Sequence, residues 1–446
     1  MALGACAHYT PRPLTAAAVQ KALAPRPVSR LWVRRSRLLL PALPALRVHR
    51  GQALTPDLAA VVAVVADPAL RALRARQAVA QAQVLAAGLL PNPTFSYGVG
   101  VPMSGVGLVK AFRVALGLPI RALMTRAARQ RVARLHAQAV DLTVAWQEWQ
   151  VAAQAKALVY AIEAGRAERQ LLGREVRLLR RSVAMLADGE AAGYVTAGVT
   201  ASARMALHQT QVLALTVARH VAAQSLALHG LLGLRGKVPL HLAAAARHRT
   251  FTRCLSQRFW QQGVSHRRLD LLALRRGYRS QDAALRLAIA DQFPRLTLGL
   301  NRARDTSDIN TLGAGIGISL PIFNHNQGAI AIARASRAAL LQAYAARLFT
   351  ARAQIQGLLT RLANLRRTRA ATAAAVRSLA RLHTIYRVAL AHHRIPALTY
   401  YRLLERLTHE RLAQLKDRAL LDQTAVALEA ASGRFTWPIA GCKGSA

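Results

Sequence analysis

The stretch LGAGIGISLPIFNHNQGAIAIAR, residues 312–334, changes its pattern at Pro321. Before this proline, apolar side chains alternate with glycine and serine, which is typical of a β-strand with one apolar face and one nearly bare face. After Asn326, Gln327 and Gly328, alanine and arginine follow at helical spacing. The stretch therefore predicts a strand that leads into a long helix.

The same switch occurs earlier in the chain, at VALGLPIRALMTRAARQR (114–131). Three further pairs of segments are also separated by about 200 residues. They are LPNPTFSYGVG (90–100) with DQFPRLTLGLN (291–301), MLADGEAAGYVTAG (185–198) with ALAHHRIPALTYY (389–401), and LHGLLG (228–233) with LEAASG (428–433). A nearly constant offset predicts an internal duplication, in which each copy reads helix, strand, strand, very long helix, turn, helix. We expect a basic N-terminal segment over 1–54, a first repeat over 55–240 and a second repeat over 265–435.

The predicted helices are bounded by local signals. Asp67 and Pro68 are typical of an N-cap and a first helical residue, and Gly88 of a helix end. The two long helices, over 123–187 and 329–390, should each measure roughly 95 Å and must pack along other helices. Composite columns of similar length arise if the helix 199–231 stacks on 268–291, and 398–431 on 67–88. We therefore expect a long antiparallel bundle.

Four strands are expected, over 94–102, 110–118, 295–303 and 311–320, each close to the length that spans a bilayer as a strand. Their apolar rows predict a lipid-facing surface. This surface consists of Phe112, Val114, Leu116, Leu296, Leu298, Ile316 and Ile318. Four strands cannot close a barrel, and an open edge leaves backbone groups unpaired in lipid. The chain must then oligomerise, with eight strands from two copies or twelve from three, and the small residues opposite the apolar rows favour twelve.

The composition limits the alternatives. The chain has 446 residues, 53% of them hydrophobic, and a formal net charge of +43. Such a charge invites a nucleic-acid interpretation, but the arginines are spread over every helical stretch and no known nucleic-acid-binding motif accompanies them. The longest apolar run, LAAVVAVVA (58–66), is too short for a membrane-spanning helix. The three cysteines lack metal-ligand spacing, and no catalytic motif is present, so we expect neither an enzyme nor a cofactor.

Taken in order, these segments resemble a TolC-type outer-membrane efflux protein over about 55–435. The resemblance is carried by ADPAL (66–70), AAGLLPNPTFSYG (86–98), FPRLTLGL (293–300) and LPIFNHNQGAIAIARA (320–335). It implies an α+β membrane protein with the TolC-like, duplicated layout. Three copies would form a twelve-stranded β-barrel in the outer membrane, continuous with a long periplasmic α-helical coiled-coil barrel.

The resemblance also implies a function and partners. The homotrimer would conduct substrates passively from a periplasmic adaptor and an inner-membrane pump of the resistance-nodulation-division type to the exterior. The wording of 323–331 is most like the heavy-metal branch of this family. The segment LGAC (3–6) resembles a lipobox, and CAHYTPRPL (6–14) the lipidated N-termini of family members, so Cys6 is the expected lipid attachment site.

The same resemblance places the adaptor-docking tips at the two turns farthest from the strands. They comprise Asp188, Gly189 and Glu190 in the first copy, and His392, His393 and Arg394 in the second. The basic residues of the second tip argue against an acidic gate. Adjacent histidines of a helix point about 100° apart, so we expect solvated turn residues and no metal site.

Two further hypotheses remain open on the sequence alone. One is a basic coiled coil that binds nucleic acid, and the other is a soluble helical scaffold. The first predicts DNA binding that weakens steeply with salt. The second predicts that a lysine in place of Ile316 or Ile318 is harmless.

Overall fold

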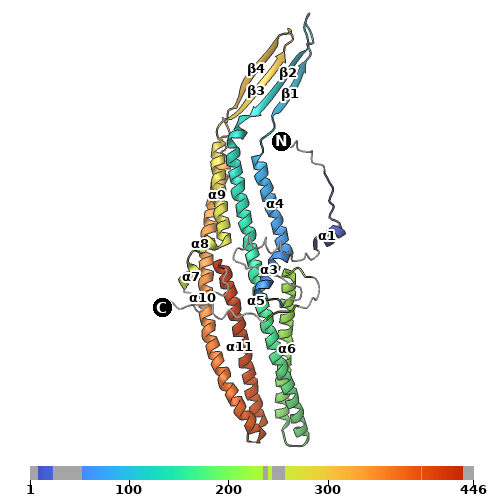
Figure 1. The fold of residues 1–446 in the computed structure, drawn as a ribbon, viewed down its shortest axis with the longest axis vertical. Helices are drawn as coiled ribbons and strands as arrows, with labels where there is room; N and C mark the ends of the chain where they lie inside the picture. Colours follow the sequence, from blue (N-terminus) through green and yellow to red (C-terminus); the bar gives the residue numbers. More distant parts are fainter. Residues whose placement is uncertain (1–8, 24–52, 235–239, 244–256, 393, 435–446) are drawn as a thin grey trace.

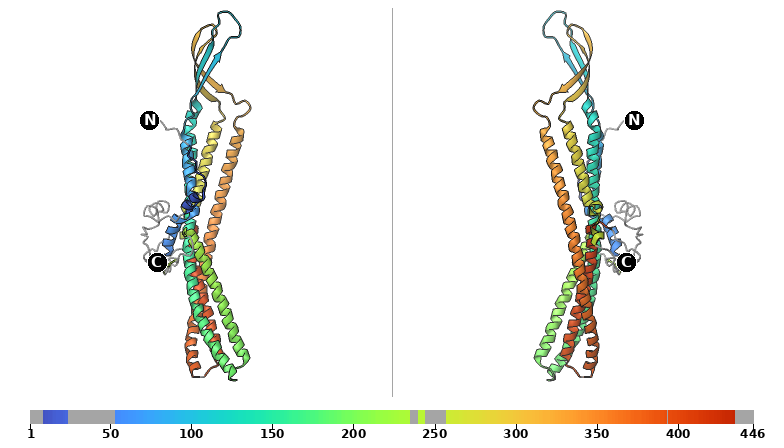
Figure 2. Two further views of the ribbon diagram at one scale, coloured as in Figure 1. Left: turned by 90° about the vertical axis from the view of Figure 1, so that its right-hand side faces the viewer. Right: turned by 90° about the vertical axis from the view of Figure 1, so that its left-hand side faces the viewer.

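The computed structural model describes residues 9–23, 53–234, 240–243, 257–392 and 394–434. These residues form a long, narrow molecule (Figures 1 and 2). A β-sheet stands at one end, and two helical hairpins end together at the other. The expected elongated bundle is confirmed.

The duplication is visible in the order and length of the elements (Figure 1). The first copy consists of α4 (Pro68–Gly88), β1 (Thr94–Gly100), β2 (Ala111–Pro119), α5 (Ile120–Ala191) and α6 (Ala197–Leu231). The second consists of α9 (Leu269–Ala290), β3 (Arg295–Arg304), β4 (Asn310–Ser319), α10 (Gln327–Ala391) and α11 (Ala397–Ser432). The long helices α5 and α10 contain 72 and 65 residues, so each is about 100 Å long.

Four short helices lie outside this repeat. They are α1 (Ala16–Leu23), α3 (Pro56–Ala66), α7 (Gln257–Gln261) and α8 (Val264–Arg267). The apolar run that begins at Leu58 forms most of α3, which packs against α5 near the middle of the molecule. Its alanines Ala59 and Ala63 are fully buried against Val159 and Leu228. The run is therefore part of the core.

The predicted cap at Asp67 is present. Its Oδ1 accepts hydrogen bonds from the backbone N–H groups of Ala69 (2.6 Å) and Leu70 (3.0 Å), and Pro68 is the first residue of α4. These bonds satisfy donors that have no partner within the helix. The helix ends at Gly88, as its sequence predicts.

The two strand-to-helix switches differ in detail. In the first copy α5 begins at Ile120, directly after β2, so the short gap expected before residue 123 is absent. Pro119 ends the strand with φ −76°, an angle that its ring fixes and that also suits a helix start.

In the second copy the residues before α10 form a tight turn. The side chain of Asn324 accepts from the N–H of Asn326 (2.9 Å), and Gln327 accepts from that of His325 (2.8 Å). Asn326 has φ 61° and donates its side-chain amide to the carbonyl of Ala288 at the end of α9 (2.8 Å). The asparagine-rich turn over 324–327 therefore starts α10 and fastens it to α9.

The stacking of the shorter helices differs from the expected one. The end of α11 meets the start of α9, where Arg268 donates to the carbonyl of Ala431 (3.1 Å). The end of α6 meets α3 and the start of α4, where a side chain at Gly233 would lie 2.8 Å from the carbonyl oxygen of Ala66. Each composite column thus joins two helices of the same repeat (Figure 1). The expected pairing across repeats is wrong, because either pairing gives nearly the same column length and only tertiary contacts distinguish them.

Ion pairs inside the bundle connect α3, α5 and α11. The Lys156 side chain is 4% exposed, and its Nζ lies 2.7 Å from Asp57 Oδ1 and 3.4 Å from Glu429 Oε2. Burial lowers the pKa of Lys156, but the negative charges of Glu429 and Asp57 outweigh it and raise the pKa above its ordinary value. Lys156 is therefore charged and holds helices of both repeats together.

Candidate membrane-facing sheet and helical tips

The four strands form one antiparallel sheet in the order β1-β2-β3-β4. Directly opposed residues of an antiparallel sheet share a face. The register pairs Leu116 with Leu300, Leu298 with Ile316, and Leu296 with Ile318. The apolar rows of the strands therefore lie on a single face.

This apolar face includes every side chain that the sequence places in lipid. Its apolar members are Phe95, Tyr97, Val99, Phe112, Val114, Leu116, Leu118, Leu296, Leu298, Leu300, Leu312, Ala314, Ile316 and Ile318, and at its outer end the register adds Arg302, Arg304 and Asn310. Phe112 and Val114 are half-buried, whereas Ile316 is 70% exposed in the single chain. The sequence alone gave no register for β1, whose Phe95, Tyr97 and Val99 extend the face.

The opposite face of the sheet is small and polar. Its central rows pair Ser96 with Ala115, Asn301 and Gly313 across the four strands. Glycine recurs on this face, and a Cβ added at Gly315 would meet no atom within 4 Å. The sheet therefore presents one apolar and one uncrowded polar surface.

Both edges of the sheet lack a partner strand in the single chain. Within the described residues, β1 pairs only with β2, and β4 only with β3. Such edges are templates for further strand pairing. A second copy of the chain could extend the sheet on either side.

Arg121 joins the sheet to the helices of both repeats. Its Nη2 lies 2.8 Å from Asp291 Oδ1, and it also donates to the carbonyls of Ala290, Phe293 and Pro294. These groups lie where α9 ends and β3 is about to begin. The residue thus fixes the start of α5 beside the start of β3.

The first predicted tip lies at the far end of α5 from the sheet (Figure 1). Asp188, Gly189 and Glu190 occupy its last turn, and Gly193 follows with φ 75°. The carbonyl of Gly189 accepts from the N–H groups of Tyr194 (2.8 Å) and Val195 (3.2 Å). This turn reverses the chain into α6.

The second predicted tip joins α10 to α11 at the same end. His392 follows α10, and the N–H of Arg394 bonds to the carbonyl of Ala389 (2.8 Å). His393 lies outside the described residues. Within the described residues, no cluster of three or more His, Cys, Asp or Glu side chains has a geometry that could hold a metal ion.

Polar side chains near this tip couple α10 to α11. His383 Nε2 lies 3.1 Å from the hydroxyl oxygen of Tyr400. Burial lowers the pKa of His383, and the nearby charges of Arg411 and Arg387 lower it further. The imidazole is therefore neutral at neutral pH, a feature that the sequence did not single out.

A buried carboxylate links the two hairpins. Glu175 of α5 accepts a hydrogen bond from the Thr408 hydroxyl of α11 (2.8 Å), while its second oxygen has no hydrogen-bond partner in the described structure. Burial raises the pKa of Glu175, with Thr408 acting in the opposite direction. Spacing along one helix could not reveal this site, because its partner lies on another repeat.

The structure leaves the expected lipid attachment site untested. Cys6, the expected lipid attachment residue, lies outside the described residues, as does most of the basic segment before residue 53. None of the described helices is both long and apolar enough to cross a membrane.

A comparison with protein families finds a match over the second repeat. Residues 260–434 match the family described as outer membrane efflux protein. A comparison with curated proteins finds no match.

Solved structures share the fold over most of the chain. CusC, whose structures are described in terms of folding and transmembrane channel formation, is 17% identical with a TM-score of 0.70, covering 88% of this chain and 98% of its own. The CmeC outer membrane channel of Campylobacter jejuni is 14% identical with a TM-score of 0.70, and 87% and 90% of the two chains are covered. The MtrE outer membrane channel of Neisseria gonorrhoeae is 14% identical with a TM-score of 0.66, with coverage of 85% and 89%. These likenesses establish the TolC-like fold.

Proposed function

We infer that the chain is the outer-membrane channel of an efflux system, because residues 260–434 match the outer membrane efflux protein family. The observation that carries this proposal is the sheet. One of its faces is apolar from the helix end up to the outer end of β3 and β4, where Arg302, Arg304 and Asn310 lie. Its two edges are open, and its strands lead into helices about 100 Å long. A periplasm-spanning duct needs these features together.

The apolar face is the surface that contacts lipid. Exposed leucine and isoleucine side chains on a strand are stabilised by hydrocarbon, and the backbone groups of edge strands must pair there. In our proposal β1 of one copy pairs with β4 of the next, which closes a ring. Three copies supply twelve strands, and the small residues of the opposite face leave the interior open.

The helices offer matching surfaces for self-association. Within the chain α4 and α6 pack mainly on α5, and α10 packs on α9 and α11, so their outer faces have no neighbour of comparable size. Large apolar side chains lie on them, including Leu85 (68% exposed), Leu215 (71%) and Phe349 (76%). Contact with neighbouring copies would remove these side chains from water, which favours a homotrimer.

The turns around Asp188–Glu190 and His392–Arg394 are the proposed docking sites for a periplasmic adaptor. They are the farthest points from the sheet and carry charged side chains at helix ends. The adaptor would connect the channel to an inner-membrane pump of the resistance-nodulation-division type, in its heavy-metal or drug branch. The channel itself conducts passively, since the energy enters at the pump.

The test is a pair of lysine substitutions on adjacent positions of β4. Ile316→Lys places a charge on the apolar face, at a cost of about 2–4 kcal/mol near the bilayer midplane. Gly315→Lys places the same charge on the opposite face, where nothing lies within 4 Å of the added Cβ. We expect the first variant to lose outer-membrane trimers and efflux in a host that lacks its own channel, and the second to keep both.

Equal behaviour of the two variants would refute the lipid-facing assignment. If both were harmless and the purified chain were soluble without detergent, a helical scaffold would be the better interpretation. If the chain instead retarded DNA at low salt, the nucleic-acid hypothesis would replace the channel.

A further inference from the structure

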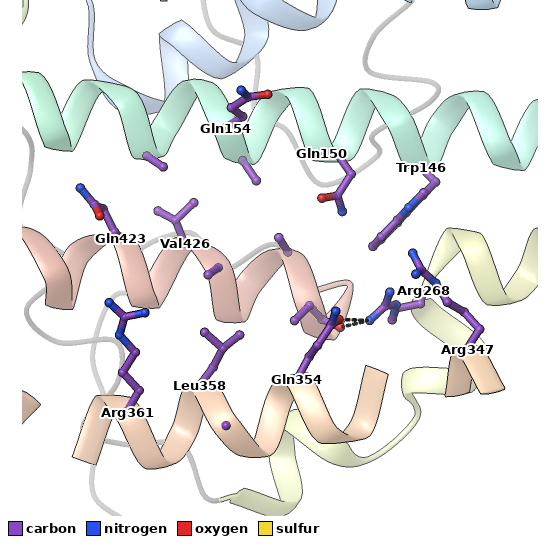
Figure 3. A pocket seen from close by; sticks show the side chains of 16 residues that line it. Trp146, Gln150, Gln154, Arg268, Arg347, Gln354, Leu358, Arg361, Gln423 and Val426 are labelled. Carbon is purple, nitrogen blue, oxygen red and sulfur yellow. Dashed lines mark hydrogen bonds between the residues drawn. The ribbon is translucent and has the colours of Figure 1, made fainter. Parts of the chain in front are cut away.

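A hollow of about 930 Å³ lies between α5, α10 and α11, near the middle of the molecule (Figure 3). Its volume falls in the range of small-molecule sites. Trp149 and Ala152 of α5 pack against α3, whereas Ala153 and Ala157 line the hollow. Because successive helical residues point about 100° apart, the hollow opens on a face of α5 that α3 does not cover.

One side of the hollow carries two arginines that share a single carboxylate. Asp270 Oδ2 lies 2.7 Å from Arg268 Nη2 and 2.6 Å from Arg347 Nε. Burial raises the pKa of Asp270, but hydrogen bonds and charges from both arginines outweigh it and lower the pKa overall. The carboxylate is therefore ionised, and this group keeps one excess positive charge.

The guanidinium of Arg268 is held firmly at the wall. It lies 4.7 Å from the ring centroid of Trp146 and donates to the carbonyl of Ala431 (3.1 Å), and the residue is 1% exposed. A buried and fixed cation contributes a stronger field than a solvated one. It is part of the hollow and not a mobile surface side chain.

Arg361 supplies a second positive charge from α10. Its side chain lies along the hollow, on the same side as Leu358 (Figure 3). In the described part of the chain no hydrogen bond or ion pair engages it. The side-chain amides of Gln150 and Gln423 border the same space and are likewise free to bind a ligand.

Apolar groups complete the hollow. Val426 and Leu358 project into it (Figure 3). Alanines of α5 and α11, which we call the floor, also line it. We propose that this hollow binds amphipathic organic anions, with Arg361 and the glutamine amides holding a carboxylate or sulfonate and the floor holding the apolar body. Planar guanidinium and amide donors suit such anions, and charge-assisted bonds are the strong ones. Only the interpretation of this ligand as exported cargo rests on the proposed efflux function.

Gly357 offers a way to fill the site without changing its charge. It lines the hollow, and a Cβ built there meets no atom within 4 Å. A glycine within a helix is less favourable than a larger residue by up to about 1 kcal/mol. Gly357→Phe should therefore occupy the space while leaving α10 intact.

The experiment measures binding of naphthalenesulfonate to the purified full-length protein in detergent, by calorimetry against detergent alone. Naphthol serves as the neutral analogue with the same ring system. Variants Arg361→Gln and Gly357→Phe are compared with Arg352→Gln, which removes an exposed arginine of α10 that does not line the hollow. Circular dichroism and the oligomeric state of each variant verify folding.

We expect saturable binding of the sulfonate, weaker by about tenfold or more in Arg361→Gln and lost in Gly357→Phe. Binding should be unchanged in Arg352→Gln, and naphthol should bind far more weakly. Absent saturable binding, equal affinity for naphthol, or equal affinity in all variants would overturn the proposal.

Efflux measured in the same variants separates the two proposals. A channel that works but binds no sulfonate contradicts the site alone. A protein that binds the sulfonate through Arg361 but supports no efflux contradicts the channel function and leaves the site standing.

Discussion

Replacing Lys156 by methionine tests how the buried ion pairs hold the two repeats together. In the wild type Lys156 of the first repeat contacts Asp57 of α3 and Glu429 of the second repeat, and the side chains of Lys156 and Glu429 are 4% and 6% exposed. The variant leaves Glu429 without this cation in a site that water hardly reaches. Removing one partner of a buried pair costs about 3–5 kcal/mol.

The structure favours the lower end of this range. Asp57 is 28% exposed and can recover hydration, whereas Glu429 cannot. We therefore expect Lys156→Met to lower the free energy of unfolding by about 3 kcal/mol. The double variant with Glu429→Gln also removes the carboxylate charge that Lys156 neutralises in the wild type, so it should recover most of this loss.

The assay is guanidinium unfolding of the three proteins in detergent, followed by far-ultraviolet circular dichroism. Lowering the pH gives an independent signature in Lys156→Met, since the buried Glu429 carboxylate, once the Lys156 cation is removed, gains stability when it binds a proton. In the wild type, the contribution of Lys156 to stability does not increase in this way as the pH falls. Because the folded-state pKa of Lys156 is raised, its contribution is complete at neutral and acidic pH and declines only as the pH rises through that pKa. A single variant as stable as the wild type, or a double variant less stable than the single one, would refute the reasoning.

Three further predictions concern the helices, the loops and the N-terminus. Glu175→Gln should raise the unfolding midpoint at neutral pH, because a raised folded-state pKa means that the ionised Glu175 carboxylate destabilises the fold. The wild type regains this stability as the pH falls through the folded-state pKa of Glu175. A higher midpoint of the variant that persists at acidic pH would contradict this. Ser104 and Ser307 lie in the loops at the sheet's outer end, so cysteines introduced at these positions should react with a membrane-impermeant maleimide on intact cells. As a control, Thr196→Cys lies beside the opposite tip and should not react until the cells are opened. Cys6→Ser should abolish incorporation of labelled palmitate, and full labelling of this variant would exclude Cys6 as the lipid attachment site.

The sequence was sufficient for features that depend on neighbouring residues. Asp67, Pro68 and Gly88 set helix bounds through backbone bonds within a few positions, and α4 begins and ends where their chemistry predicts. Alternation along β2, β3 and β4 likewise predicted which side chains share a face, because the strand period is two residues regardless of what the strand pairs with.

Only the tertiary structure decided how segments distant in the chain stack, pair and pack against one another. Helix lengths permit α6 to stack on either α4 or α9, and the contact of Gly233 with Ala66 decides for α3 and α4. The pairing of β2 with β3 merges two hairpins into one sheet, and the hollow around Arg361 needs side chains from both repeats. Local patterns reflect backbone bonding over a few residues, whereas these arrangements depend on side-chain packing between segments hundreds of residues apart, so no periodicity in the sequence could specify them.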